Sequence, residues 1–103
     1  MSCYRLTPEA AKDLESIIAH IAYDNPDAAA QVLEAMTEAF EALSTMPHMA
    51  PKRARLAAKF PELRFWPIPR YRNYLIFYEP DSEGIRVIRI LHAARDGDKI
   101  LGS

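Results

Sequence analysis

The residues with the clearest chemical potential follow the apolar run Ile88–Leu91, where His92, Arg95 and Asp96 stand in close succession. A histidine can accept a proton near neutral pH, and an arginine can hold a phosphate through paired N–H donors. Acid–base cleavage of RNA needs such a base together with cations that stabilise the developing negative charge. His92 is the candidate base for this chemistry, and Arg72 or Arg95 is the candidate phosphate ligand.

The same residues also fit a purely structural role. In that interpretation His92 caps the end of a strand, and Arg95 pairs with Asp96 or Asp98. A short polar turn after a buried strand needs its backbone groups and charges satisfied locally. We therefore predict that His92, Arg95 and Asp96 form a clasp at the strand end. Because the sequence offers no convincing acid partner for His92, we expect that the chain has no catalytic residues. Were it a nuclease, the acting set would be His92, Arg72 and Arg95.

Charge is segregated along the chain, although the formal net charge is only −1. Residues 1–50 carry eight acidic and two basic side chains, whereas residues 51–72 carry seven basic side chains and one acidic one. Such segregation can steer a polyanion to one face of a neutral protein, and Phe65, Trp66 or Tyr71 could then stack on bases. It equally suits a solvated loop whose charges neutralise the acidic half.

Several other chemistries lack the residues that they need. His20, His48 and His92 stand far apart without ligand spacing, and there is no cysteine pair, so we expect no metal site. Cys3 is the single cysteine, and a small buried thiol is far commoner than a nucleophile. Only three glycines are present and they form no phosphate-binding loop, so no cofactor is expected.

The length of 103 residues, half of them hydrophobic, suits one domain that spans residues 1–103. No apolar run approaches the roughly 18 residues of a membrane-spanning helix, and the first residues lack the apolar core of a secretory signal. One cysteine allows no disulfide framework within the chain. We therefore expect a soluble, cytoplasmic protein without membrane contact.

Two helix starts have the same signature. Thr7-Pro8-Glu9 and Asn25-Pro26-Asp27 each place a capping residue, a proline and an acid in succession. These signals predict helices over Pro8–Asp24 and Pro26–Thr45, and the break at Asn25 predicts an antiparallel helical hairpin. The apolar positions predicted to be buried are Ala10, Leu14, Ile17, Ile18 and Ile21 in the first helix and Ala29, Val32, Leu33, Met36, Phe40 and Leu43 in the second.

The second half of the chain has the pattern of strands. Arg64–Trp66 is followed by prolines, which favours an edge strand or a bulge. Tyr74–Tyr78 and Ile85–Leu91 flank a turn at Pro80–Gly84 and predict a hairpin, and Cys3–Leu6 is a plausible fourth strand. The order βααβββ predicts an α+β fold, with the helical hairpin packed on one face of a mostly antiparallel four-stranded sheet.

Four segments in this order resemble the ParE branch of the RelE/ParE toxin superfamily: RLTPEAAKDLESIIAHIA, DNPDAA, RFWPIPRYRNYLIFYEP and GIRVIRILHAARD. The likeness covers about residues 4–96. A last strand that ends in His92, two small residues, Arg95 and Asp96 is typical of such toxins.

The resemblance implies a toxin of a type II toxin–antitoxin pair, with a small ParD-like antitoxin whose tail wraps the toxin. DNA would then be contacted only indirectly, through the antitoxin. ParE-like toxins inhibit DNA gyrase without a catalytic step, whereas RelE-like relatives cut mRNA at the ribosome with basic residues and a C-terminal tyrosine. No tyrosine follows Arg95 here. We therefore expect a gyrase inhibitor; a RelE-type mRNA endonuclease and a degenerate, non-toxic member that still binds antitoxin are the alternatives.

Candidate contact residues for the two partners lie in different parts of the chain. Tyr23, Phe65 and Trp66 are surplus to the predicted core stripes and are the candidates for antitoxin contact. Lys99, Ile100 and Leu101, in the tail after Gly97, are the candidates for target contact, together with Arg72.

Overall fold

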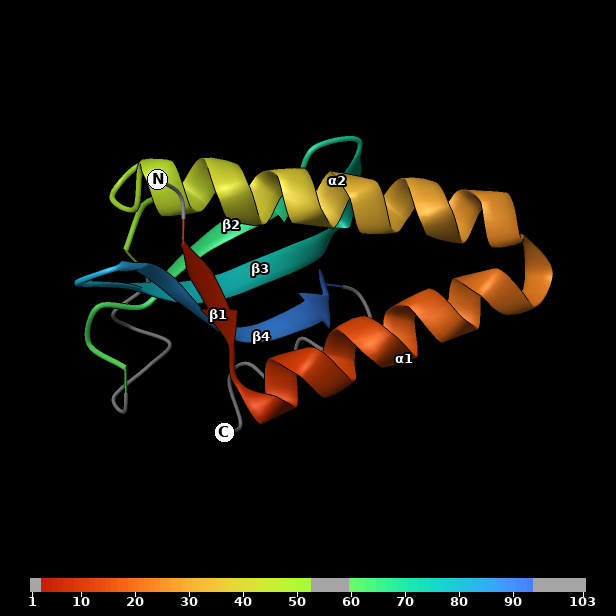
Figure 1. The fold of residues 1–103 in the computed structure, drawn as a ribbon, viewed down its shortest axis with the longest axis horizontal. Coiled ribbons are helices and arrows are strands. Elements are labelled where there is room, and N and C mark those ends of the chain that lie inside the picture. Colours follow the sequence, from red (N-terminus) through yellow and green to blue (C-terminus); the bar gives the residue numbers. More distant parts are fainter. Residues whose placement is uncertain (1–2, 53–59, 94–103) are drawn as a thin grey trace.

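A helical hairpin covers one face of a four-stranded sheet in the computed structural model, which describes residues 3–52 and 60–93 (Figure 1). The elements follow the order β1 (Tyr4–Leu6), α1 (Pro8–Asp24), α2 (Pro26–Thr45), β2 (Arg64–Ile68), β3 (Tyr71–Asp81) and β4 (Gly84–His92). The strand order is β1-β4-β3-β2, with β1 parallel to β4 and the other pairs antiparallel. The predicted α+β fold and its βααβββ order are confirmed.

Both helices begin at the predicted caps. The Thr7 hydroxyl accepts a hydrogen bond from the Ala10 N–H at 3.1 Å, and the Asn25 side chain accepts one from the Ala28 N–H at 3.0 Å. Asn25 also ends α1, because its extended backbone donates to the Ile21 carbonyl and then leaves the helix. One residue thus closes the first helix and opens the second, and the predicted bounds of both helices are confirmed.

The main core lies between the helices and the sheet. Met36, Phe40 and Leu43 of α2 are almost wholly buried, and the ring of Phe40 lies 5.2 Å from that of Tyr4 on β1. A smaller apolar cluster occupies the other face of the sheet, where Leu63, Phe77, Ile88 and Leu91 are buried with Phe60, Phe65 and Leu75 packed against them. Both faces of the central strands β3 and β4 are therefore apolar.

Leu33 is the exception to the predicted helix stripes, because its side chain is 39% exposed. The buried face of α2 is centred near Met36 and extends toward Ala35 and Ala39, which are also buried. On a helix with 3.6 residues per turn, Leu33 lies on the other flank of this buried face from Ala35 and Ala39. The prediction that Leu33 faces the sheet is wrong, and its exposure becomes relevant to binding.

β2, β3 and β4 are longer than their sequence patterns indicated, whereas β1 is one residue shorter than the predicted Cys3–Leu6. β3 extends over Tyr71–Asp81 and includes Pro80, which pairs in register with Ile85. Proline is tolerated there because β2 reaches only to Tyr78, so β3 has a single neighbour at Pro80. The predicted turn Pro80–Gly84 is accordingly too long. β2 lies at the sheet edge and has a register shift after Pro67, which confirms the edge-or-bulge prediction.

Two side chains of the sheet hold the segment that follows α2. The Tyr78 hydroxyl donates to the Pro47 carbonyl at 2.9 Å, and the Arg64 guanidinium donates to the Ala50 carbonyl at 2.6 Å. Tyr78 is fully buried. Burial raises the pKa of the Tyr78 phenol, and the nearby Ala50 backbone and Arg64 charge only partly oppose this rise.

Tyr78→Phe is expected to destabilise the fold by about 1–2 kcal/mol at neutral pH, because the Pro47 carbonyl loses its donor. The raised pKa means that the folded state favours the neutral phenol over the phenolate. In the unfolded chain the phenol titrates at about pH 10. The stability gained from Tyr78 is therefore complete below about pH 10 and is lost as pH rises through the higher folded-state pKa. Melting curves from about pH 8 to 11 should show a steeper alkaline decline for the parent than for Tyr78→Phe; parallel curves would contradict this assignment.

None of the described helices is long and apolar enough to cross a membrane.

Candidate functional site

The first candidate surface is the end of the sheet at which β4 finishes. His92 lies directly opposite Tyr74 of β3, with the two rings 5.1 Å apart and nearly perpendicular at 87°. Such edge-to-face packing is a favourable arrangement for aromatic rings. The contact places the His92 ring at the rigid end of the sheet, half-buried.

Arg72 lies at this same end of the sheet, near the start of β3, and its side chain is exposed. The structure therefore brings two of the three candidate nuclease residues, His92 and Arg72, to one end of the sheet. Arg95 and Asp96, which complete the nuclease set and the clasp, lie outside the described residues. So do the target-contact candidates Lys99, Ile100 and Leu101.

A β-bulge determines which residue of β4 meets Tyr74. Phe77 pairs with Arg89 and Tyr78 pairs with Val87, so Ile88 is an extra residue without a partner on β3. With an uninterrupted register, Tyr74 would lie opposite Leu91 and the histidine would be displaced by one position. A one-residue shift reverses the side-chain faces of a strand.

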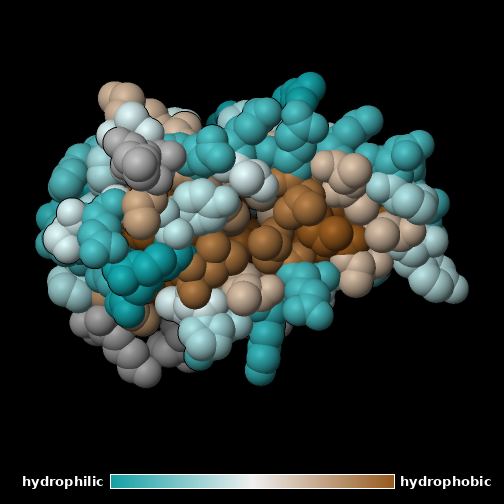
Figure 2. Space-filling model, in the orientation of Figure 1, coloured by the Kyte–Doolittle hydropathy of each residue, from teal (hydrophilic) through white to brown (hydrophobic). Residues whose placement is uncertain are grey.

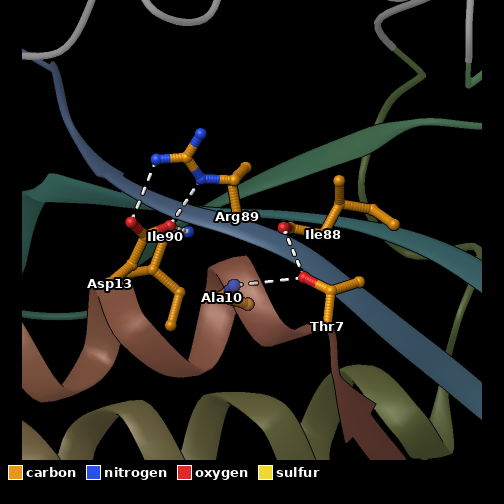
Figure 3. A network of polar contacts seen from close by, with 6 residues as sticks. All are labelled: Thr7, Ala10, Asp13, Ile88, Arg89 and Ile90. Carbon is orange, nitrogen blue, oxygen red and sulfur yellow. Dashed lines mark hydrogen bonds and ion pairs between the residues drawn. The ribbon is translucent and has the colours of Figure 1, made fainter.

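The bulge is held by the side chains of Thr7, the N-cap of α1, and of Asp13 on α1, which take the place of a missing strand (Figure 3). β1 pairs with β4 only as far as Val87, which leaves the following part of β4 without a strand neighbour on that side. The Thr7 hydroxyl donates to the Ile88 carbonyl at 2.8 Å, and the Asp13 carboxylate accepts from the Ile90 N–H at 3.0 Å. The carbonyl of the bulge residue and the N–H two residues further on are thus satisfied by the N-cap and the second turn of the helix.

The same Asp13 carboxylate forms a two-point ion pair with Arg89. The arginine Nε donates to Oδ2 at 2.7 Å, and a terminal nitrogen donates to Oδ1 at 3.0 Å (Figure 3). Paired, charge-assisted hydrogen bonds of this kind are among the stronger polar contacts in proteins. Sequence reasoning missed this network, although a carboxylate between Ala10 and Ile17 at helical spacing was a signal, because that stripe faces the sheet.

A second candidate surface is the apolar band between the two helices. Figure 2 shows apolar side chains gathered in a band between α2 and α1 on the face that the helices form. Leu14, Ile18 and Ile21 of α1 are only partly buried against the core, and Leu33 of α2 is exposed. The two helices thus leave several branched side chains partly accessible. An apolar surface of this kind commonly marks a site of protein contact.

Acidic residues surround this helical layer. The two helices contain eight aspartates and glutamates and a single lysine, Lys12. On α2, Glu34, Glu38 and Glu41 are exposed on the side opposite the buried face. The face that carries the apolar band is therefore flanked by negative charge.

The three predicted antitoxin-contact residues have different surroundings. Tyr23 is 90% exposed near the end of α1, as expected for a residue surplus to the core. Phe65 instead stacks on Phe77 in the smaller apolar cluster, and Trp66 packs against the main core on the opposite face. The prediction that Phe65 and Trp66 are surplus to the core is wrong, because adjacent residues of β2 face opposite sides and both sides are apolar.

Within residues 3–52 and 60–93, no three histidine, cysteine, aspartate or glutamate side chains are grouped so that they could hold a metal ion. Cys3 is a free, half-buried cysteine.

The family model described as the ParE toxin of the type II toxin–antitoxin system parDE matches residues 4–97. The chain belongs to the ParE toxin family. A solved chain from the chromosomal ParDE toxin–antitoxin system of P. aeruginosa shares the fold, with a TM-score of 0.69. It is 20% identical in sequence, and the match covers 89% of this chain and 96% of that one. No curated protein matches the sequence.

The match extends from β1 past the end of β4 and includes all six elements. The resemblance to ParE that four sequence segments indicated is therefore confirmed. The chain is a toxin-family member of a type II toxin–antitoxin system.

Proposed function

We propose that this ParE-family chain acts in the cytoplasm as a toxin that binds and inhibits DNA gyrase, and that a ParD-like antitoxin neutralises it. The observation that carries the proposal is the family match over residues 4–97, together with the complete βααβββ fold. The proposed action is by contact, without a catalytic step of the toxin's own.

The apolar band between α1 and α2 is the proposed binding surface for the antitoxin. A disordered tail gains affinity when it places apolar anchors in such a surface, and it orders as it binds. Leu33 is an exposed branched side chain that a soluble monomer has no structural need to display. Tyr23 remains a candidate at the edge of the helical layer, and Phe65 and Trp66 would contribute only through their accessible parts.

The proposed gyrase contact involves the tail residues Lys99, Ile100 and Leu101 together with Arg72. In the same proposal Arg95 and Asp96 form the clasp with His92 at the end of β4, and they support the tail rather than contact the target. Arg95→Ala should then lower the melting temperature, whereas truncation after Asp96 should remove toxicity and leave melting unchanged.

The test of the proposed function is induced expression, followed by parallel assays of gyrase supercoiling and of translation. Inhibited supercoiling with intact mRNA, reversed by the antitoxin from the neighbouring reading frame, supports the proposal. Growth without any inhibition, despite antitoxin binding, would identify a degenerate member instead.

A RelE-type mRNA endonuclease is the second candidate function, and one observation favours it. His92 and Arg72 lie at one end of the sheet, where a base and a phosphate ligand would be needed. Cleavage of mRNA on ribosomes that is lost in both His92→Ala and Arg72→Ala would replace the gyrase proposal with this one.

Leu33→Gln is expected to weaken antitoxin binding about tenfold or more, because a central apolar anchor loses its contact. The fold should change in stability by less than about 0.5 kcal/mol, since the side chain is already exposed. Met46→Gln is the matched control: Met46 is 59% exposed but lies beyond the other end of α2. Titration calorimetry with the antitoxin would contradict the proposed surface if the two variants bind equally well.

A further inference from the structure

The hairpin that joins β2 to β3 has an unusual residue in its turn. Ile68 pairs with Tyr71, so Pro69 and Arg70 form a two-residue loop. Arg70 has a φ of +72°, and among the described residues it is the only non-glycine with a positive φ. Proline followed by a positive φ is the pattern of a type II turn, whose third position normally carries glycine or asparagine.

Arginine at this position is strained, because its Cβ is crowded in the left-handed region. The strain is not offset by burial, since the Arg70 side chain is exposed. Arg72 is exposed as well, two residues further along the hairpin. A strained residue that packing does not explain is a reason to look for a function of its side chain.

The charge of these two arginines is not neutralised by the described part of the chain. Other exposed cations of the sheet are paired, Arg5 with Asp81, Lys52 with Glu62 and Arg86 with Glu79. Those pairs lie at the opposite end of the sheet, where β2 begins and β3 joins β4. Among the described residues, neither Arg70 nor Arg72 has an ion-pair partner. The β2–β3 hairpin is therefore a cationic projection on a chain of net charge −1.

We propose that the β2–β3 hairpin is a contact site for the phosphates of a nucleic acid, with Arg70 and Arg72 as the phosphate ligands. Arg70 is the last residue of the turn and Arg72 is the second residue of β3, so the two long side chains start two residues apart and can reach separate phosphates of one backbone. Tyr71 and Tyr74, on the same stretch of β3, are partly buried against the main core, so the hairpin rests on a packed base. This direct contact goes beyond the toxin–antitoxin function proposed above and does not depend on it.

A phosphate backbone fits this hairpin better than an acidic protein surface does. A protein interface needs an apolar centre inside its polar rim. The exposed large hydrophobic residues of the described chain are Tyr23, Leu33, Met46 and Met49, all on the helices or directly after α2. None belongs to the hairpin, whose larger apolar side chains are partly buried against the two apolar clusters, so its exposed turn offers mainly donors and positive charge.

The test measures binding of the full chain to short fluorescent RNA, single-stranded DNA and duplex DNA of one sequence, by anisotropy at about 50 and 200 mM salt. Arg70→Gly and Arg72→Gln should each weaken binding about threefold to tenfold and lower the log–log salt slope by about one. Arg70→Gly should also raise the melting temperature by about 4–8 °C, because the turn loses its strain. Arg86→Gln, an exposed arginine at the far end of the sheet, is the matched control and should bind like the parent.

Tighter binding to one of the three probes, the RNA, the single-stranded DNA or the duplex DNA, supports the site and identifies the class of its ligand. The proposal is overturned if the parent binds none of the three probes, or if Arg70→Gly and Arg72→Gln bind as the parent does. Equal binding to polyglutamate would also overturn it, because the hairpin would then recognise negative charge in general. Since Arg70→Gly is expected to stabilise the fold, loss of binding in that variant cannot be attributed to unfolding.

Discussion

Gly84→Ala is expected to detach β1 from the sheet and to destabilise the protein by about 3 kcal/mol or more. Gly84 begins β4 with a φ of +147°, a conformation that residues with a side chain rarely adopt. A Cβ at this position would also overlap the carbonyl oxygen of Cys3. That oxygen accepts the Ile85 N–H at 3.2 Å, where the parallel β1–β4 ladder begins. Melting temperature should fall by about 12–24 °C.

Two further variants separate the causes of this loss. In a chain that begins at Tyr4, the Cys3 carbonyl is absent, so Gly84→Ala should cost only the backbone strain of about 1–2 kcal/mol. Ser82→Ala, in the exposed turn nearby, controls for substitution in the hairpin and should leave melting unchanged. An equal loss from Gly84→Ala in the full and shortened chains would show that contact with Cys3 is not its main cause.

The helices were predictable to the residue because their ends depend on local chemistry. Thr7 and Asn25 satisfy N–H groups only three residues away, and the prolines that follow are compatible with a first turn alone. No distant part of the chain has to be known for these signals to act. Leu33 shows where local information ends, because the helix spacing defines a stripe but not which flank the sheet will cover.

Strand extents and register were less predictable because they depend on partners. Pro80 marks the end of a strand in the sequence pattern, yet β3 continues through it where only one neighbouring strand is present. The bulge at Ile88 has no sequence signature of its own, because it arises where the helix supplies side chains to the open edge of β4. Its consequence is nonetheless large, since it places His92 opposite Tyr74.

The surroundings of the candidate site residues could be predicted only in part, because they too depend on which elements pack against them. The exposure of Tyr23 followed from its surplus position, whereas the partial burial of Phe65 and Trp66 required knowledge that both faces of β2 are covered. The strain at Arg70 could not be predicted either, because arginine is an atypical residue for the positive-φ position of a turn.

Asp13→Ala is expected to cost about 2–4 kcal/mol, which makes Asp13 the most sensitive polar residue of the described helices. The substitution removes the two-point ion pair to Arg89 and the acceptor of the Ile90 N–H in one step. The Asp13 side chain is only 16% exposed, so solvent cannot readily replace the lost contacts, although Arg89 at 33% retains some access to water. Asp13→Asn should cost less, because an amide oxygen still accepts the Ile90 N–H.

The effect should also reach the end of β4, because Thr7 holds the carbonyl of the bulge residue Ile88 and Asp13 holds the N–H of Ile90 just after it. Loosening the bulge should increase hydrogen exchange of the Ile90 amide and shift the ring resonances of Tyr74 and His92. Glu15→Ala is the matched control, since Glu15 is an exposed carboxylate on the same helix. If Asp13→Ala melts within about 0.5 kcal/mol of the Glu15 variant and leaves both ring signals unchanged, the helix does not position the strand end, and β4 keeps its bulge through its pairing with β3 alone.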